Sequence, residues 1–171
     1  MTKPPADPPA EIETETELLR LPGTWNFEYT YFAGETASRF FAELRDNRRV
    51  MGRRCPACRR LLVPARSFCD ACFEPTTSWE AVGEVGEIDT FTILTATFPG
   101  LPEPPLVIAF VTLEGADTAI LNFVRGVDLS DIDAAGEFLF DHPSVRVVFE
   151  ETRHGRITDF HFELERPSAR W

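Results

Sequence analysis

Cys55-Pro56-Ala57-Cys58 and Cys69-Asp70-Ala71-Cys72 are two C-x-x-C pairs that are separated by ten residues and contain all four cysteines of the chain. Each pair places two sulfur atoms on one side of a tight turn. Two such turns that face each other supply the four thiolates of a tetrahedral zinc site. The sequence therefore predicts a zinc ribbon, with a short hairpin at Leu61-Leu62-Val63-Pro64 between the pairs and with zinc bound by Cys55, Cys58, Cys69 and Cys72.

Two disulfides or a redox-active pair are the alternatives for these cysteines. The sequence shows no secretory signal, which argues against an oxidising compartment. A redox pair normally follows a strand and opens a helix in a βαβ unit, and neither pair has that context. Because four sulfur ligands leave no open coordination position, we expect the zinc to be structural, and no cysteine remains as a nucleophile.

The formal net charge of the 171-residue chain is −11, but its basic residues are concentrated in one segment. Residues 39–66 contain nine arginines and only two acids, whereas residues 74–151 contain fifteen acids and two arginines, a net charge of −13. The acidic segment should repel a phosphate backbone. No apolar run approaches the roughly 18 residues of a membrane span, and no targeting segment is recognised, so we expect a cytoplasmic protein without a membrane partner.

Residues 1–20 are proline-rich and then acidic, and we expect them to be a disordered tail. In the next segment, residues 21–50, four aromatic residues alternate with other residues, which places them on one face of an extended chain. These side chains either cover the core of the protein or form a strip that contacts a partner protein. They are Trp25, Phe27, Tyr29 and Tyr31.

Ala37, Phe40, Phe41 and Leu44 have the i, i+3, i+4, i+7 spacing of an amphipathic helix, which we expect to end near Asn47. Phe40 and Phe41 should pack on the ribbon, on the following domain or on a partner. Together with the four preceding aromatic residues, they are the candidate partner interface.

Strands dominate the chain after the ribbon, which we place at residues 51–76. Five strands are predicted in residues 77–166, with a loosely helical insert between the third and the fourth. This order fits an OB-fold, a five-stranded barrel with a helix after the third strand. The expected strands are 86–98, 106–113, 118–125, 145–150 and 157–164, with 79–82 as the approach to the first and 128–142 as the insert.

No catalytic residue is assigned from the sequence. His142, His154 and His161 are each expected to be exposed or locally hydrogen-bonded, because none belongs to a recognisable nucleophile–base motif. The segment 83–87 contains two glycines but precedes a strand and carries two glutamates, so it is a poor phosphate cradle.

The arginines beside the cysteines have two explanations. A four-thiolate zinc centre carries a net charge of −2, which neighbouring arginines can offset. Alternatively, their guanidinium groups bind an anion such as a nucleotide, a pyrophosphate or an acidic partner surface. The densest positive run consists of Arg48, Arg49, Arg53 and Arg54.

Three motifs in this order carry a family resemblance. They are F-F-x-x-L-R-D at residues 40–46, the cysteine motif with Pro64 and Arg66, and W-x-x-V-x-x-x-G-x-I-x-x-F-T at residues 79–92. Over about residues 25–164, the chain resembles the zinc-ribbon/OB-fold family long known as a domain of unknown function.

The resemblance implies a mainly β protein that is the small subunit or fused domain of a thiolase-like enzyme. Such partners include thiolases and the aldolases that shorten steroid side chains. In such hetero-oligomers the large partner supplies the catalytic residues, and the small protein supports it and helps to bind or guide the acyl-CoA. On this basis, the four arginines of the positive run are candidate contacts for the phosphates of a coenzyme A thioester.

Two other functions compete with this one. Zinc ribbons and OB-folds also bind nucleic acids, although the charge of residues 74–151 argues against that role. A free-standing acyl-CoA-binding protein is the third possibility.

Overall fold

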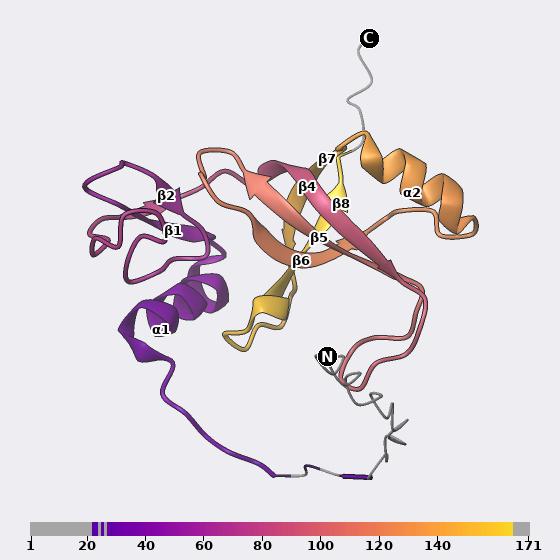
Figure 1. Cartoon of the computed structure of the whole chain (residues 1–171), viewed down its shortest axis with the longest axis horizontal. Coiled ribbons are helices and arrows are strands. Elements are labelled where there is room, and N and C mark those ends of the chain that lie inside the picture. The colour runs from indigo at the N-terminus through magenta and orange to yellow at the C-terminus, as the bar shows by residue number, and fades with distance from the viewer. Residues whose placement is uncertain (1–21, 24, 26, 166–171) are drawn as a thin grey trace, which may run out of the picture. The chain divides into compact units, whose positions relative to one another are not determined.

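The computed structural model describes residues 22, 23, 25 and 27–165, so the tail expected over residues 1–20 lies outside the described residues. The chain divides into two compact units, Met1–Tyr31 and Phe32–Trp171, and each is described by itself. The second unit (Figure 1) contains, in chain order, α1 (Gly34–Ala42), η1 (Glu43–Asn47), β1 (Met51–Arg54), β2 (Leu61–Leu62), β3 (Trp79–Ala81), β4 (Val85–Leu94), β5 (Leu106–Leu113), β6 (Ile120–Arg125), α2 (Ile132–Phe140), β7 (Ser144–Phe149), η2 (Ile157–Asp159) and β8 (Phe160–Leu164).

The helix predicted from the apolar spacing is present as α1, and its last turn, η1, is π-helical. One face carries the buried side chains of Phe40 and Leu44. The helix ends at Arg48, whose φ of 49° lies in the left-handed region and turns the chain into β1. A left-handed residue directly after the last turn is a common way to end a helix.

A small three-stranded sheet, ordered β2-β1-β3, forms the ribbon together with the two cysteine turns. The segment 79–82, expected as the approach to the first barrel strand, contains β3, which pairs with β1, with Met51 opposite Ala81 and Arg53 opposite Trp79. The four-residue β1 can pair on both sides, so β3 completes the ribbon sheet before the chain enters the barrel.

β4, β5, β6, β8 and β7 hydrogen-bond in this order and close into a barrel, and α2 lies between β6 and β7. The prediction of a mainly β protein with an N-terminal helix and a five-stranded sheet is confirmed, whereas the OB-fold name stays a prediction. β4 pairs with both β5 and β7, and at Gly86 it meets Leu113 on one side and Val145 on the other. A Cβ atom at Gly86 would lie 2.4 Å from the carbonyl oxygen of Thr112, so only glycine fits there.

Ribbon, helix and barrel share one hydrophobic core. Phe40 and Leu44 of the helix and Val63 of the ribbon belong to the same buried cluster as Phe160 and Phe162 of β8. The only other buried cluster within the described residues is small and consists of Cys55, Leu62 and Cys69. The ribbon is therefore anchored through the barrel core on one side and through its cysteines on the other.

Hydrogen bonds fix β2 against the turn between β5 and β6. The backbone N–H of Leu61 donates to the Asp117 carboxylate at 2.7 Å, and the Asp117 N–H donates to the Leu61 carbonyl at 2.9 Å. The N–H of Val63 donates to the Thr118 hydroxyl at 2.7 Å, and that hydroxyl donates to the Val63 carbonyl at 2.8 Å. Each of these donors and acceptors has a hydrogen-bond partner, so the ribbon is held in one register on the barrel.

The barrel closes through a short parallel seam between β6 and β8. Only Val124–Phe162 and Arg125–Glu163 are paired in this ladder. Before these pairs, the buried side chain of Asn122 donates from Nδ2 to the carbonyl oxygens of Ile157 and Phe160, both at 2.9 Å. A side-chain amide thus replaces backbone pairing where the two strands separate.

A loop between β7 and β8 is organised by the buried carboxylate of Asp159. It accepts hydrogen bonds from the backbone N–H groups of His154, Gly155 and Arg156. In the same loop, Arg153 Nε donates to the carbonyl oxygen of Arg45 at 2.8 Å, which ties the loop to η1. None of the helices in the described part of the chain has the length and apolar composition needed to cross a membrane.

Replacing Asp159 by Asn should destabilise the fold in a pH-dependent way. Burial raises the pKa of Asp159, but the three N–H donors outweigh it and place the pKa below its ordinary value of 3.8. The carboxylate therefore stabilises the fold above the unfolded pKa, and this contribution is lost as the pH falls through the lower folded pKa. We expect Asp159→Asn to lower the free energy of unfolding by about 1–3 kcal/mol at pH 7 in urea titrations.

The difference between wild type and Asp159→Asn should shrink when the same titration is performed near pH 3. Asp141→Asn, at an exposed carboxyl group, serves as the control and should change little. Equal stability of wild type and Asp159→Asn at pH 7 would contradict the role of this carboxylate.

Candidate metal centre

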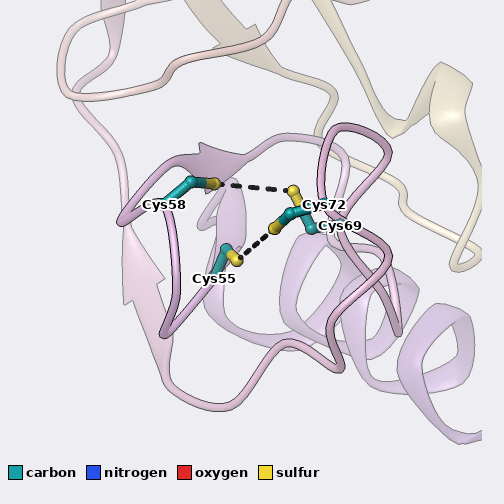
Figure 2. A group of neighbouring side chains, drawn as sticks. All are labelled: Cys55, Cys58, Cys69 and Cys72. Carbon is teal, nitrogen blue, oxygen red and sulfur yellow. Dashed lines mark hydrogen bonds between the residues drawn. The ribbon is translucent and has the colours of Figure 1, made fainter.

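The four cysteines lie together, with all sulfur atoms within 4.8 Å of one another (Figure 2). Cys55 Sγ is 3.3 Å from Cys72 Sγ, and Cys58 Sγ is 3.6 Å from Cys69 Sγ. These separations are too long for disulfides, and all four residues are free cysteines. Zinc–sulfur bonds of about 2.3 Å in a tetrahedron require sulfurs roughly 3.8 Å apart, so the arrangement fits one zinc ion.

The two cysteine turns have the same local geometry. The N–H of Arg59 donates to the Cys55 carbonyl at 3.0 Å, and the N–H of Phe73 donates to the Cys69 carbonyl at 3.0 Å. Arg59 and Phe73 each follow the second cysteine of a pair and have left-handed φ values of 65° and 59°. Non-glycine residues adopt this conformation rarely, so its appearance at two equivalent positions marks two matched turns facing one site.

Backbone N–H groups favour the thiolate form in the first cysteine of each pair. The N–H groups of Cys72 and Ala71 lower the pKa of Cys69 to about 6, although burial opposes them. The N–H of Cys58 is the main cause that lowers the pKa of Cys55. In contrast, the hydrogen bond with the Cys55 sulfur raises the pKa of Cys72 to about 12, because it favours the protonated thiol. A divalent cation bound by the four sulfurs would favour the thiolate form of all of them.

Arginines next to the sulfurs are themselves paired. Arg60 and Arg66 both donate to the Asp70 carboxylate, at 2.9 and 3.0 Å. Asp70 and nearby sulfurs raise the pKa of Arg60 although burial lowers it, so this guanidinium is a permanent positive charge beside Cys58 and Cys69. This arrangement agrees with charge compensation of a thiolate centre.

The four arginines of the positive run do not form one cluster. Arg49 pairs with Glu43 at 2.7 Å, and Arg54 forms two bonds of 2.6 Å with Glu80. Arg53 donates to the Thr36 hydroxyl at 3.0 Å and lies over the Trp79 ring, with 5.5 Å between guanidinium and ring centre. Because adjacent residues of a strand point to opposite faces, Arg53 and Arg54 of β1 lie on different sides of the ribbon.

Arg48 differs from the other three. It is exposed at the end of η1, and within the described residues it makes no ion pair. It is the one member of the run whose side chain forms no hydrogen bond or ion pair with another described residue, so its guanidinium is the first candidate to contact a ligand or partner.

The aromatic residues before the helix form a continuous row, here called the aromatic row. Successive ring centres from Trp25 to Phe27, Tyr29 and Tyr31 are 5.8, 5.6 and 6.0 Å apart, so all four rings lie on one side of the segment. Their exposed fractions range from 61% to 88%.

The two candidate interface residues of α1 differ in exposure. Phe40 is only 2% exposed and lies in the shared core, so its ring is not free to contact a partner. Its neighbour Phe41 is half-buried and packs against the same core. The sequence spacing identified the apolar face of the helix, but the barrel covers that face.

Each histidine either forms a hydrogen bond with nearby residues or lies in a turn. His142 Nδ1 lies 2.6 Å from the Ile88 carbonyl oxygen, and the N–H of His154 donates to Asp159. His161 is buried against Glu150, and sequence alternation placed it only on the polar face of its strand.

These elements define a mainly β protein in which a four-cysteine ribbon is joined to a closed five-stranded barrel. Residues 42–78 match the family model described as the ChsH2 rubredoxin-like zinc ribbon domain. The ribbon is thus a rubredoxin-like zinc ribbon, and its four clustered cysteines support a structural zinc ion.

Two solved structures share the fold. One is the crystal structure of a DUF35-family protein of unknown function from Sulfolobus solfataricus, with a TM-score of 0.55 and 20% identity over 77% of this chain and 87% of that chain. The other is a chain of the Ltp2-ChsH2(DUF35) aldolase, with a TM-score of 0.55 and 18% identity over 78% of this chain and 98% of that chain. No curated protein sequence matches the chain. The ribbon match and the shared fold support the family resemblance indicated by the sequence motifs.

Purified protein should contain about one zinc ion per chain in metal analysis. Cys69→Ser should lose the zinc and unfold the ribbon, because a structural zinc contributes on the order of 10 kcal/mol to the segment that it folds. The loss would be seen as faster proteolysis in residues 51–81.

Ala71→Ser provides the matched control, since it changes an exposed residue inside the same cysteine turn and keeps all four thiols. It should retain zinc. Protein that contains two intact disulfides and no metal would contradict the zinc assignment.

Proposed function

We propose that this protein is a non-catalytic subunit that binds and supports a thiolase-like partner, a thiolase or an aldolase, in acyl-CoA metabolism. The observation that carries this proposal is the combination of a ChsH2-type zinc ribbon with a fold shared by the DUF35 chain of an aldolase. The metal is assigned to Cys55, Cys58, Cys69 and Cys72, and four thiolates leave no position for substrate. The chain's contribution is then structural, and the partner carries the reacting groups.

The aromatic row is proposed as part of the surface that binds the partner. Four neighbouring exposed rings between Trp25 and Tyr31 present a continuous apolar strip. Burial of such rings contributes roughly 25 cal/mol per Å² of apolar surface, and aromatic side chains are enriched in the centres of protein interfaces. A hetero-oligomer would cover the strip.

Tyr29→Ala or Tyr31→Ala should weaken the complex with the partner about tenfold or more, because truncation of a central interface aromatic typically costs more than 1 kcal/mol. The affinity is measured by surface plasmon resonance with a thiolase-like protein that co-purifies with the chain. Zinc content and thermal unfolding of the isolated chain should stay unchanged.

Phe110→Ala is the control for a general loss of exposed aromatic surface, since Phe110 lies on β5 and is also partly exposed. It should bind the partner like the wild type. Should Tyr29→Ala and Tyr31→Ala unfold the isolated protein, the row would belong to the protein's own core, and the interface assignment would fail.

We further propose that the positive run helps to bind the phosphates of the partner's coenzyme A thioester or lines its approach. Among Arg48, Arg49, Arg53 and Arg54, the first forms no ion pair with another described residue, and the Arg49 side chain is half exposed although it pairs with Glu43. Arg53 and Arg54 form hydrogen bonds to other residues of the chain and would act mainly by positioning the other two arginines. Guanidinium groups suit phosphate oxygens because they offer paired donors.

Arg48→Glu should raise the KM of the assembled complex for acyl-CoA about tenfold at low ionic strength, and the double change with Arg49→Glu should raise it further. A charge-assisted contact is lost and a repulsive one is gained, and salt should reduce the effect. Arg146→Glu, on the distant β7, makes the same charge change as the control and should leave the KM unaltered. An unchanged KM in the double variant would assign these arginines to charge balance.

A further inference from the structure

A cavity of about 650 Å³ opens beside the β6–β8 seam. Its walls are mainly apolar and come from the β4–β5 loop and from three strands. They include Leu101, Leu106, Phe123 and Phe160, and the polar lining side chains are Arg125, Thr158 and His161. The volume lies within the 300–1,000 Å³ of typical small-molecule sites, and apolar walls with a few convergent polar groups are their usual composition.

The cavity exists because backbone pairing does not join β6 and β8 along the whole seam. β6 and β8 pair only from Val124 and Phe162 onward. Where they separate, Asn122 satisfies the carbonyl oxygens of Ile157 and Phe160 from inside the barrel. Backbone acceptors that would otherwise require water are already bonded, so the apolar wall suits an apolar occupant.

One end of the cavity carries a fixed positive charge. The side chain of His161 is 5% exposed, and its Nδ1 lies 3.0 Å from Glu150 Oε1. Arg125 Nη2 lies 2.9 Å from the same oxygen, and Arg125 Nη1 is 3.4 Å from His161 Nε2. The guanidinium is therefore fixed by Glu150, with the His161 ring beside it.

Arg125 keeps donors for a ligand in spite of these contacts. Its side chain is 57% exposed, and a guanidinium has five N–H groups, of which the two contacts occupy only part. Arg125 and His161 line the cavity, whereas Glu150 does not. Glu163 also lies outside the lining, with one oxygen 3.3 Å from His161 Nε2. The charged side chain that lines the cavity is therefore the Arg125 guanidinium, although the carboxylates of Glu150 and Glu163 lie next to the lining residues.

We propose that this cavity is a binding site for a small apolar molecule that ends in a single carboxylate, with the carboxylate on Arg125 and the apolar body against Phe123 and Phe160. The cavity has one guanidinium, which suits one carboxylate and not a chain of phosphates. The net charge of −13 over residues 74–151 further disfavours polyanions. The residues that line this cavity include none of the zinc-binding cysteines and none of the aromatic row, so the proposal does not depend on the proposed function.

The test is isothermal titration of the zinc-loaded full-length protein with decanoate below its micelle concentration. Wild type should bind about one decanoate per chain. Arg125→Gln should weaken binding about tenfold, because a charge-assisted hydrogen bond is lost. Arg146→Gln, an exposed arginine on β7, should bind like the wild type. Decanol, which lacks the carboxylate, should bind wild type as weakly as decanoate binds Arg125→Gln.

Leu101→Asp tests the apolar wall independently, because this loop residue is partly exposed and its replacement should not disturb the barrel. It should abolish decanoate binding, with circular dichroism and zinc content unchanged. The proposal is overturned if wild type binds no decanoate, or if Arg125→Gln and Leu101→Asp bind it like the wild type. Affinity for the thiolase-like partner is measured separately, so failure of this site leaves the proposed function untouched.

Discussion

The rest of the structure depends on the fact that the ribbon cannot bury a core of its own. Within residues 51–81, the buried cluster that belongs to the ribbon alone consists of Cys55, Leu62 and Cys69, while Val63 and Ala65 belong to the core shared with the barrel. A segment of this size requires a metal or a neighbour for stability. Here it has both, since the thiolates lie on one side and the barrel covers the other.

The local parts of this arrangement could be predicted from the sequence. The spacing of Cys55, Cys58, Cys69 and Cys72 specifies two turns, because few residues separate the members of each pair. The helix around Phe40 and Leu44 follows from the 3.6-residue period. The boundaries of β5 are those expected from the nearly continuous apolar run of residues 106–113. In each case the signal lies within a few residues of the feature that it determines.

Contacts between distant segments could not be predicted in the same way. Periodicity identified the buried face of α1 but not that Phe40 joins the core shared with the barrel, and it gave no sign that β3 pairs with β1. Arg125 and His161 are 36 residues apart, and only the parallel seam places them beside each other. His161, expected to be exposed or locally hydrogen-bonded, is 5% exposed and has Glu150 as a partner 11 residues away in the chain. A single sequence indicates which residues are buried, and only the fold shows which neighbours bury them.

The seam between β6 and β8 has a consequence for how such a barrel can change over evolutionary time. The other neighbouring strands of the barrel are joined by more residue pairs than β6 and β8. A substitution on those strands must therefore preserve tight packing against the neighbouring strand. At the seam, two backbone pairs and the Asn122 amide keep the barrel closed. Side chains around the opening can then be exchanged at little cost to closure. Variation among relatives should therefore concentrate at this opening, and a new specificity could arise there without a new fold.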